Sequence, residues 1–229
     1  MRYKGFLLDI DHTLYDYNIV HKKSLEKLLQ STQDATSLQR VTIKNAYSQA
    51  RSQINSELAE TASSHNRLLY IQRMLELLNF NSMNLALNIY NAYWDTFLCA
   101  MEPFDGVINF LDSCHAVPIC LVTDLTAHIQ HRKIEKLGLY KYATHLVTSE
   151  EAGREKPHPY MFMLALKKLN LNVEDVCMIG DNYSKDILGA SALGIKSFWL
   201  NKDNKKENIE SELIQEFQCF KTLGKMINE

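Results

Sequence analysis

Two aspartates stand two positions apart in Asp9-Ile10-Asp11-His12-Thr13, directly after a short apolar run. Residues that follow a buried strand lie at the edge of a parallel sheet where ligands bind. One carboxylate of such a pair can attack as a nucleophile while the other exchanges a proton. The pattern DxDxT is short enough to arise by chance, so it predicts a catalytic site only together with other groups.

Two later segments carry residues that suit a phosphate group. The apolar run at 118–122 ends at Thr123-Asp124, where a hydroxyl and a turn of backbone N–H groups can bind phosphate oxygens. Lys156, which supplies a positive charge, precedes Pro157. We expect Pro157 to help start a helix and so to fix the lysine.

A second pair of acids follows another apolar run. The run at 176–179 leads into Gly180-Asp181, and Asp186 comes five residues after Asp181. Beside Asp9 and Asp11, they make four carboxylates that would repel one another without a divalent cation. Ligand sets made only of oxygen atoms favour Mg²⁺, which takes one or two carboxylates, waters and a substrate phosphate. We therefore predict a magnesium ion bound among these four aspartates.

The elements that would position these groups alternate between strands and helices. Segments with helical spacing, such as Ile129, Lys133, Ile134 and Leu137, separate the short apolar runs. This order implies right-handed crossovers and a parallel sheet with helices on both faces. The sequence thus predicts an α/β fold, a doubly wound Rossmann-like core, with strands at 5–10, 118–123, 145–148, 176–180 and 197–200.

The stretch from Tyr17 to Met101 differs, because it contains no strand-like run and neither Pro nor Gly. Apolar residues at helical spacing predict four helices, the first near 21–30. Because the stretch follows the first strand, we expect an inserted helical-bundle cap at 17–100 and a core domain made of 1–16 and 101–229. The alternative is that these helices pack on the sheet as part of one compact domain.

Composition argues against several classes of protein. Lys and Arg number 25 against 27 Asp and Glu, so the net charge of −2 does not indicate a nucleic-acid partner. No segment approaches the ~20 apolar residues that a membrane span needs, and the first apolar run is too short for a signal peptide. The five cysteines, an odd number without a CxxC pair, are interpreted as buried, reduced thiols. We expect a cytoplasmic protein without a membrane partner, and the sequence favours neither a monomer nor a dimer.

The ordered set of DxDxT, a strand-end Thr, Lys before Pro, and GDxxxxD resembles the haloacid dehalogenase-like hydrolase superfamily. The insertion after the first motif resembles its subfamily I, which has a helical cap, and the resemblance covers essentially the whole chain. It implies that Asp9 is the nucleophile and Asp11 the general acid and base. It also implies that Thr123 and Lys156 hold the phosphate, that Asp181 is a magnesium ligand and that Asp186 supports the metal through water.

Asp11 indicates the reaction class within that family. Members that cleave carbon–halogen bonds lack this second acid, because a halide leaves without protonation, whereas the alkoxide of a phosphate ester needs a proton. We therefore predict a Mg²⁺-dependent phosphatase, a phosphoric monoester hydrolase that works through an aspartyl-phosphate. To be protonated at neutral pH, Asp11 would need its pKa raised from about 3.9 to about 7, and a neighbouring carboxylate and the phosphate could supply much of that rise.

The expected substrate is a small phosphorylated metabolite. The chain is similar to cap-bearing phosphatases that act on sugar phosphates, on sialic-acid phosphates (N-acylneuraminate-9-phosphatase-like members) or on nucleoside monophosphates (nucleotidases), and local sequence does not separate these. One alternative is a phosphosugar mutase, which uses the same residues but returns the phosphoryl group to the substrate. Another is a non-catalytic phosphometabolite-binding protein, although binding alone does not need Asp11.

Three positions depart from the family pattern or leave a choice. His12 stands where Gly is commonest, and we interpret it as a turn or cap-facing residue. Asp124, counted among the phosphate-binding residues, replaces the usual Asn; it could repel the phosphate, bind a substrate hydroxyl or turn away. In the cap, the group His65, Arg67 and Tyr70 could reach an anionic substrate, but the sequence favours a solvated helix face with Tyr70 in the bundle.

Overall fold

The computed structural model describes residues 2–209 and 211–227. Contacts divide the chain into two units. The core unit comprises Met1–Asp16 and Glu102–Glu229, and the helical unit comprises Tyr17–Met101. The helical unit therefore ends one residue later than the cap expected at 17–100.

The core unit is built on one parallel sheet whose strand order is β3-β2-β1-β4-β5-β6. The order places β1 between β2 and β4, so the carboxyl ends of these three strands are neighbours. All five expected strands are present, which confirms the α/β fold class; the sixth strand, β6, is one that the sequence analysis missed. The strands are β1 (Gly5–Leu8), β2 (Ile119–Thr123), β3 (Ala143–Thr148), β4 (Val176–Gly180), β5 (Lys196–Leu200) and β6 (Ile214–Phe217).

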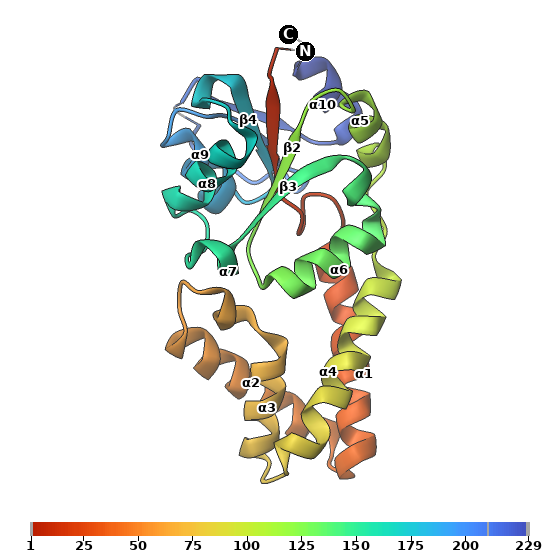
Figure 1. Cartoon of the computed structure of the whole chain (residues 1–229). Helices are drawn as coiled ribbons and strands as arrows, with labels where there is room; N and C mark the ends of the chain where they lie inside the picture. The colour runs from red at the N-terminus through yellow and green to blue at the C-terminus, as the bar shows by residue number, and fades with distance from the viewer. Residues whose placement is uncertain (1, 210, 228–229) are drawn as a thin grey trace. The chain divides into compact units, whose positions relative to one another are not determined.

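Helices cover both faces of this sheet. Helices α8 and α9 lie on one side, and α5 and α10 lie on the other (Figure 1). Helix α8 begins at Pro159, with His158 as its N-cap, so the expectation that Pro157 starts it was wrong. The helices are α5 (Val107–Ser113), α6 (Ala127–Leu137), α7 (Ser149–Ala152), α8 (Pro159–Leu169), α9 (Leu188–Ser191) and α10 (Phe220–Met226), joined by short 3₁₀ turns η2 (Leu139–Lys141) and η3 (Val173–Asp175) and a π-turn η4 (Tyr183–Ile187).

One apolar cluster of the core unit lies between the sheet and α8. Leu7, Cys120 and Met178 come from three adjacent strands, and Met161 and Phe162 come from the buried face of α8. These side chains are fully buried. Removing them from water is the main favourable contribution to folding here, and it fixes the strand ends on which the site is built.

The helical unit contains four α-helices and a 3₁₀ turn. They are α1 (Tyr17–Thr36), α2 (Arg40–Glu57), η1 (Ala62–His65), α3 (Arg67–Leu77) and α4 (Ser82–Ala100). Helix α1 is longer than the helix expected at 21–30. Asparagines begin the last two helices, because the side chains of Asn66 and Asn81 accept hydrogen bonds from the backbone N–H groups of Leu68 and Met83.

All five cysteines are free. Cys114, Cys120 and Cys177 are buried as expected, whereas Cys99 and Cys219 are exposed, so their expected burial was wrong. Among the described residues, none of the helices combines the length and the apolar character required to cross a bilayer.

Substituting Phe162 tests the packing of α8 on the sheet. Because the ring is fully buried, Phe162→Ala should lower the free energy of unfolding by about 3 to 5 kcal/mol, measured by urea titration. The control is Met163→Ala on the same helix, where the side chain is 54% exposed. That substitution should change stability by less than about 1 kcal/mol. Equal losses in the two variants would contradict this packing.

Candidate active site

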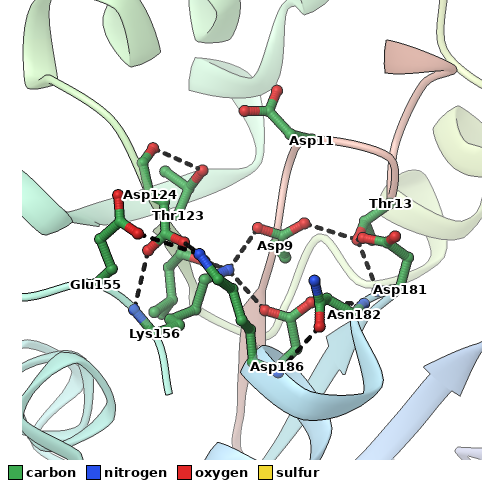
Figure 2. A network of polar contacts seen from close by, with 12 residues as sticks. Asp9, Asp11, Thr13, Thr123, Asp124, Glu155, Lys156, Asp181, Asn182 and Asp186 are labelled. Atoms are coloured by element: carbon green, nitrogen blue, oxygen red, sulfur yellow. Dashed lines mark hydrogen bonds and ion pairs between the residues drawn. The ribbon is translucent and has the colours of Figure 1, made fainter. Parts of the chain in front are cut away.

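Five of the predicted site residues converge at the carboxyl ends of the central strands (Figure 2). Asp9 follows β1, Thr123 ends β2, and Asp181 follows β4. The topology explains the convergence, since these three strands are adjacent. Lys156 comes from the loop between α7 and α8, and Asp186 comes from the π-turn η4.

Asp9 is buried and its two carboxylate oxygens have different partners. The Lys156 ammonium donates to Oδ1 at 2.6 Å, and the Thr13 hydroxyl donates to Oδ2 at 2.8 Å. Lys156 is itself buried, and its Nζ also donates to the carbonyl oxygen of Val122 at 2.9 Å. Burial raises the pKa of Asp9 to about 7, although the Lys156 charge acts in the opposite direction. The lysine therefore orients this carboxylate and supplies the nearest positive charge.

Asp186 reaches the same lysine because the residue at position 180 is glycine. Its Oδ1 lies 2.6 Å from Lys156 Nζ, and its Oδ2 accepts a hydrogen bond of 3.0 Å from the backbone N–H of Asn182. A Cβ atom on Gly180 would lie only 2.5 Å from Asp186 Oδ2. Any larger residue at 180 would displace this carboxylate, so the glycine of the GDxxxxD motif serves a close approach rather than a turn.

Asp9, Asp181 and Asp186 form an all-oxygen cluster whose members each offer a carboxylate oxygen within 4.8 Å of the others. Burial raises the pKa of Asp181 to about 7, and the charge of Asp9 adds to the effect. Three crowded carboxylates beside the ammonium of Lys156 fit a divalent cation of the magnesium type, which prefers such donors. The donor chemistry therefore agrees with the predicted metal.

Asp11 lies apart from this cluster, with its carboxyl group directed away from Asp9 (Figure 2). Its two oxygens each accept a hydrogen bond of 2.7 Å from the buried ammonium of Lys133. The Tyr15 hydroxyl also donates to it, and Gln130 Nε2 does so at 3.3 Å. The structure therefore does not bring the Asp11 side chain to the predicted metal ligands.

The electrostatic surroundings of Asp11 differ from those that the sequence suggested. Burial by itself would raise its pKa, but the charge and hydrogen bonds of Lys133 outweigh it, so the pKa of Asp11 is lowered. The expected rise assumed that Asp9 would be the nearest charge. In the structure the charge beside Asp11 is the ammonium of Lys133 from α6, and the lowered pKa keeps Asp11 ionised at neutral pH.

Comparison with known proteins agrees with this arrangement of motifs. The family model of the haloacid dehalogenase-like hydrolases matches residues 3–194. The chain belongs to this family. It is 32% identical over 209 residues to a ribulose-1,5-bisphosphate 5-phosphatase of Halopiger xanaduensis, a match that covers 90% of this chain and 87% of that protein.

Two further proteins are similar to the chain. A glyceraldehyde 3-phosphate phosphatase of Methanopyrus kandleri is 27% identical over 84% of this chain and 81% of that one. Among solved structures, a magnesium-bound HAD hydrolase of Bacillus subtilis superposes with a TM-score of 0.72 at 20% identity, covering 100% of both chains. The structural match concerns the fold, and the named relatives agree with the phosphatase branch that Asp11 indicates.

Asp124, which replaces the usual asparagine of this family, belongs to a second ion-pair group with Lys185 and Glu155. Its Oδ1 accepts from the backbone N–H of Lys156 at 3.0 Å, and its Oδ2 accepts from Lys185 Nζ at 2.9 Å. Lys185 also donates to Glu155 at 3.2 Å. The sequence left open whether Asp124 repels the phosphate, binds a substrate hydroxyl or turns away, and it did not anticipate the pairing seen in the structure, where both carboxylate oxygens have partners within the protein.

Position 12, where glycine is commonest in the family, requires a left-handed backbone. His12 has φ of 65°, a region that glycine enters at no steric cost. This agrees with the interpretation of His12 as a turn residue. Burial lowers the pKa of its imidazole.

The structure also gives roles to polar residues of the site for which the sequence analysis proposed none. Thr13 links two carboxylates, because its hydroxyl lies 2.8 Å from Asp9 Oδ2 and 3.2 Å from Asp181 Oδ1. Gln130 donates to the Thr123 hydroxyl at 2.9 Å. The sequence could have indicated the pairing of Lys133, because this lysine stands at a core-facing position of a helix among apolar residues. A buried lysine without a partner is costly there, so an acidic partner is expected.

Removing the Lys133 charge tests the pairing of Asp11. Lys133→Met leaves a largely buried carboxylate without its cation, so the free energy of unfolding at pH 7 should fall by about 3 kcal/mol. Because Lys133 holds the pKa of Asp11 below its ordinary value, the stabilisation exists above pH of about 4 and disappears as the pH falls further. Urea titrations at pH 7 and pH 3 should therefore show a deficit that shrinks at the lower pH.

The matched control is Lys136→Met, which removes an exposed lysine from the same helix. It should change stability by less than about 0.5 kcal/mol at either pH. If the two variants lose the same stability at pH 7, Lys133 does not support Asp11 in the way described.

Proposed function

We propose that this chain is a Mg²⁺-dependent phosphatase that hydrolyses a small sugar phosphate through an aspartyl-phosphate on Asp9. The observation that carries the proposal is the buried Asp9 carboxylate, held by Lys156 and Thr13 beside two further acids. An oriented carboxylate next to a fixed cation is the arrangement that in-line attack on a phosphoryl group needs.

In the first step, a carboxylate oxygen of Asp9 attacks phosphorus and the bond to the leaving oxygen breaks. Lys156 balances negative charge on the phosphoryl oxygens, and the Thr123 hydroxyl binds one of them. Asp9, Asp181 and Asp186 would hold Mg²⁺. The ion would supply positive charge that offsets the repulsion between the carboxylates and the incoming phosphate.

Asp11 exchanges the protons of both steps. It protonates the leaving oxygen in the first step, and in the second it accepts a proton from the water that hydrolyses the aspartyl-phosphate. The ionised form that Lys133 favours is the form that the second step requires. For the first step Asp11 carries the proton that it accepted from the hydrolytic water of the preceding turnover, and its side chain turns from Lys133 towards the substrate.

The named relatives support sugar phosphates over the other substrates considered. Two relatives that each match more than four fifths of the chain act on ribulose 1,5-bisphosphate and glyceraldehyde 3-phosphate, according to their names. Both are short, acyclic phosphorylated sugars. We therefore propose a substrate of this class for the present chain.

Substitution of the nucleophile tests the reaction. Asp9→Asn keeps the size of the side chain but removes the attacking oxygen anion, so kcat on a panel of sugar phosphates should fall by a factor of about 10³ or more. The assay measures released inorganic phosphate, and the control is Asp34→Asn at an exposed position of the helical unit. Unchanged turnover in Asp9→Asn would refute the assignment, and an isomerised sugar without free phosphate would indicate a mutase instead.

Magnesium binding can be measured without turnover. If Mg²⁺ binds the folded protein, a concentration 100 times its Kd should raise the free energy of unfolding by about 2.7 kcal/mol. Asp181→Asn should abolish most of this gain, because it removes one of three ligands. Gly180→Ala should also reduce it, because its Cβ displaces Asp186. Equal magnesium stabilisation in wild type and Asp181→Asn would exclude the cluster as the metal site.

A further inference from the structure

Two acids of the core unit, Asp124 and Glu155, share the ammonium of Lys185. Lys185 Nζ lies 2.9 Å from Asp124 Oδ2 and 3.2 Å from Glu155 Oε2. The side chain of Lys185 is 33% exposed, and those of Asp124 and Glu155 are 18% and 10% exposed. Solvent and salt screen such partly buried charges less than exposed ones, so their pairing is stronger than that of a surface ion pair. The proposed phosphoryl transfer has so far given this lysine no task.

Asp124 connects Lys185 to the loop that carries Lys156. Its Oδ1 accepts a hydrogen bond of 3.0 Å from the backbone N–H of Lys156, whose own ammonium reaches Asp9 at 2.6 Å. Glu155, the other partner of Lys185, precedes Lys156 in the chain. Asp124, Glu155 and Lys156 lie on the same side of Asp9 (Figure 2). Lys185 is therefore tied to this loop twice, through Asp124 and through Glu155.

The charge of Asp124 acts on the Lys156 ammonium, which is proposed to balance charge on the phosphoryl oxygens. Burial would lower the pKa of this lysine, but the charges of Asp186, Asp9 and Asp124 outweigh burial and raise that pKa. A carboxylate at position 124 also repels a phosphate group that approaches the same ammonium. The asparagine that is usual there offers a similar acceptor oxygen without the charge.

We propose that Lys185 is a positioning residue of the phosphate site and acts through Asp124. Its ammonium compensates the charge of Asp124, so that this carboxylate holds the Lys156 loop as a neutral amide would and does not repel the phosphate. Asp124 and Lys185 together thus take the place of the usual asparagine. The effect on phosphate rests on the proposed phosphatase function, whereas the hold on the loop does not.

A double-mutant cycle tests the coupling between Lys185 and Asp124. Lys185→Met leaves the Asp124 charge uncompensated, so KM for a sugar phosphate should rise roughly 10-fold while kcat changes less than about 3-fold. In an Asp124→Asn background the repelling charge is absent, and Lys185→Met should change KM less than about 2-fold. Lys185→Arg retains the charge and should raise KM less than about 3-fold.

The matched control is Lys4→Met, which removes another lysine that pairs with an aspartate of the core unit. Lys4 Nζ lies 2.7 Å from Asp175 Oδ1, and both residues directly precede strands, at the amino ends of β1 and β4. This substitution should leave KM unchanged. If Lys185→Met does not fold, Lys185→Gln also removes the charge and should give the same KM increase. An equal increase with aspartate and with asparagine at position 124 would overturn the proposal.

Hydrogen exchange measures the hold on the loop without turnover. The Lys156 amide donates to Asp124 Oδ1, and its exchange can be followed by NMR of protein labelled with ¹⁵N-lysine. Asp124→Ala removes the acceptor and should speed this exchange roughly 10-fold, whereas Asp124→Asn keeps an acceptor oxygen and should change it less than about 3-fold. Lys185→Met should speed it roughly 3-fold or more, because the Asp124 carboxylate loses the ion pair that orients it.

The exchange data separate a failure of this proposal from a failure of the proposed function. Equal exchange of the Lys156 amide in wild type, Asp124→Ala and Lys185→Met would overturn the positioning role, whether or not the chain turns over a sugar phosphate. The expected exchange pattern without any turnover would refute the phosphatase function and support the hold of Asp124 and Lys185 on the loop.

Discussion

The structure of the site depends on one electrostatic constraint: three carboxylates lie close together around a single buried lysine. Asp9 and Asp186 both approach Lys156 Nζ to 2.6 Å, and Asp181 completes the cluster. Other features follow from this crowding. Gly180 leaves room for Asp186, which belongs to the π-turn η4. Asp124 accepts a hydrogen bond from the backbone N–H of Lys156, and the charge of Asp124 is paired with Lys185. The crowding of like charges is also what makes a divalent cation the expected partner.

The same constraint separates the two aspartates of the first motif. They are two residues apart, yet each has its own lysine from a different segment: Lys156 for Asp9 and Lys133 for Asp11. Burial dominates for Asp9 and raises its pKa, whereas Lys133 outweighs burial for Asp11 and lowers it. Opposite shifts in neighbouring carboxylates are a common way to give two acids different tasks in one mechanism.

The parts of the site that sequence could predict are those fixed by strand ends. Short apolar runs located five of the six strands, and the residues after them located Asp9, Thr123 and Asp181. Strand β6, with the sequence Ile-Gln-Glu-Phe, was missed because two polar residues interrupt its apolar pattern. Lys133, Lys185 and the environment of Arg67 depend on packing between distant segments, which local periodicity does not report. The apolar helix pattern included Lys133, but the sequence analysis did not interpret this lysine as a buried charge. Arg67 was expected on an exposed helix face, because charged residues usually are exposed, whereas the structure shows that it is buried.

In the proposed mechanism, Asp9 forms a covalent bond to phosphorus. The most direct measurement is to quench the enzyme during turnover of a sugar phosphate, reduce it with borohydride and map the product by peptide mass spectrometry. Borohydride reduces an aspartyl-phosphate to homoserine, so homoserine is expected at position 9, and only when substrate is present. Homoserine at another aspartate, or none at all in enzyme that is turning over, would contradict this mechanism.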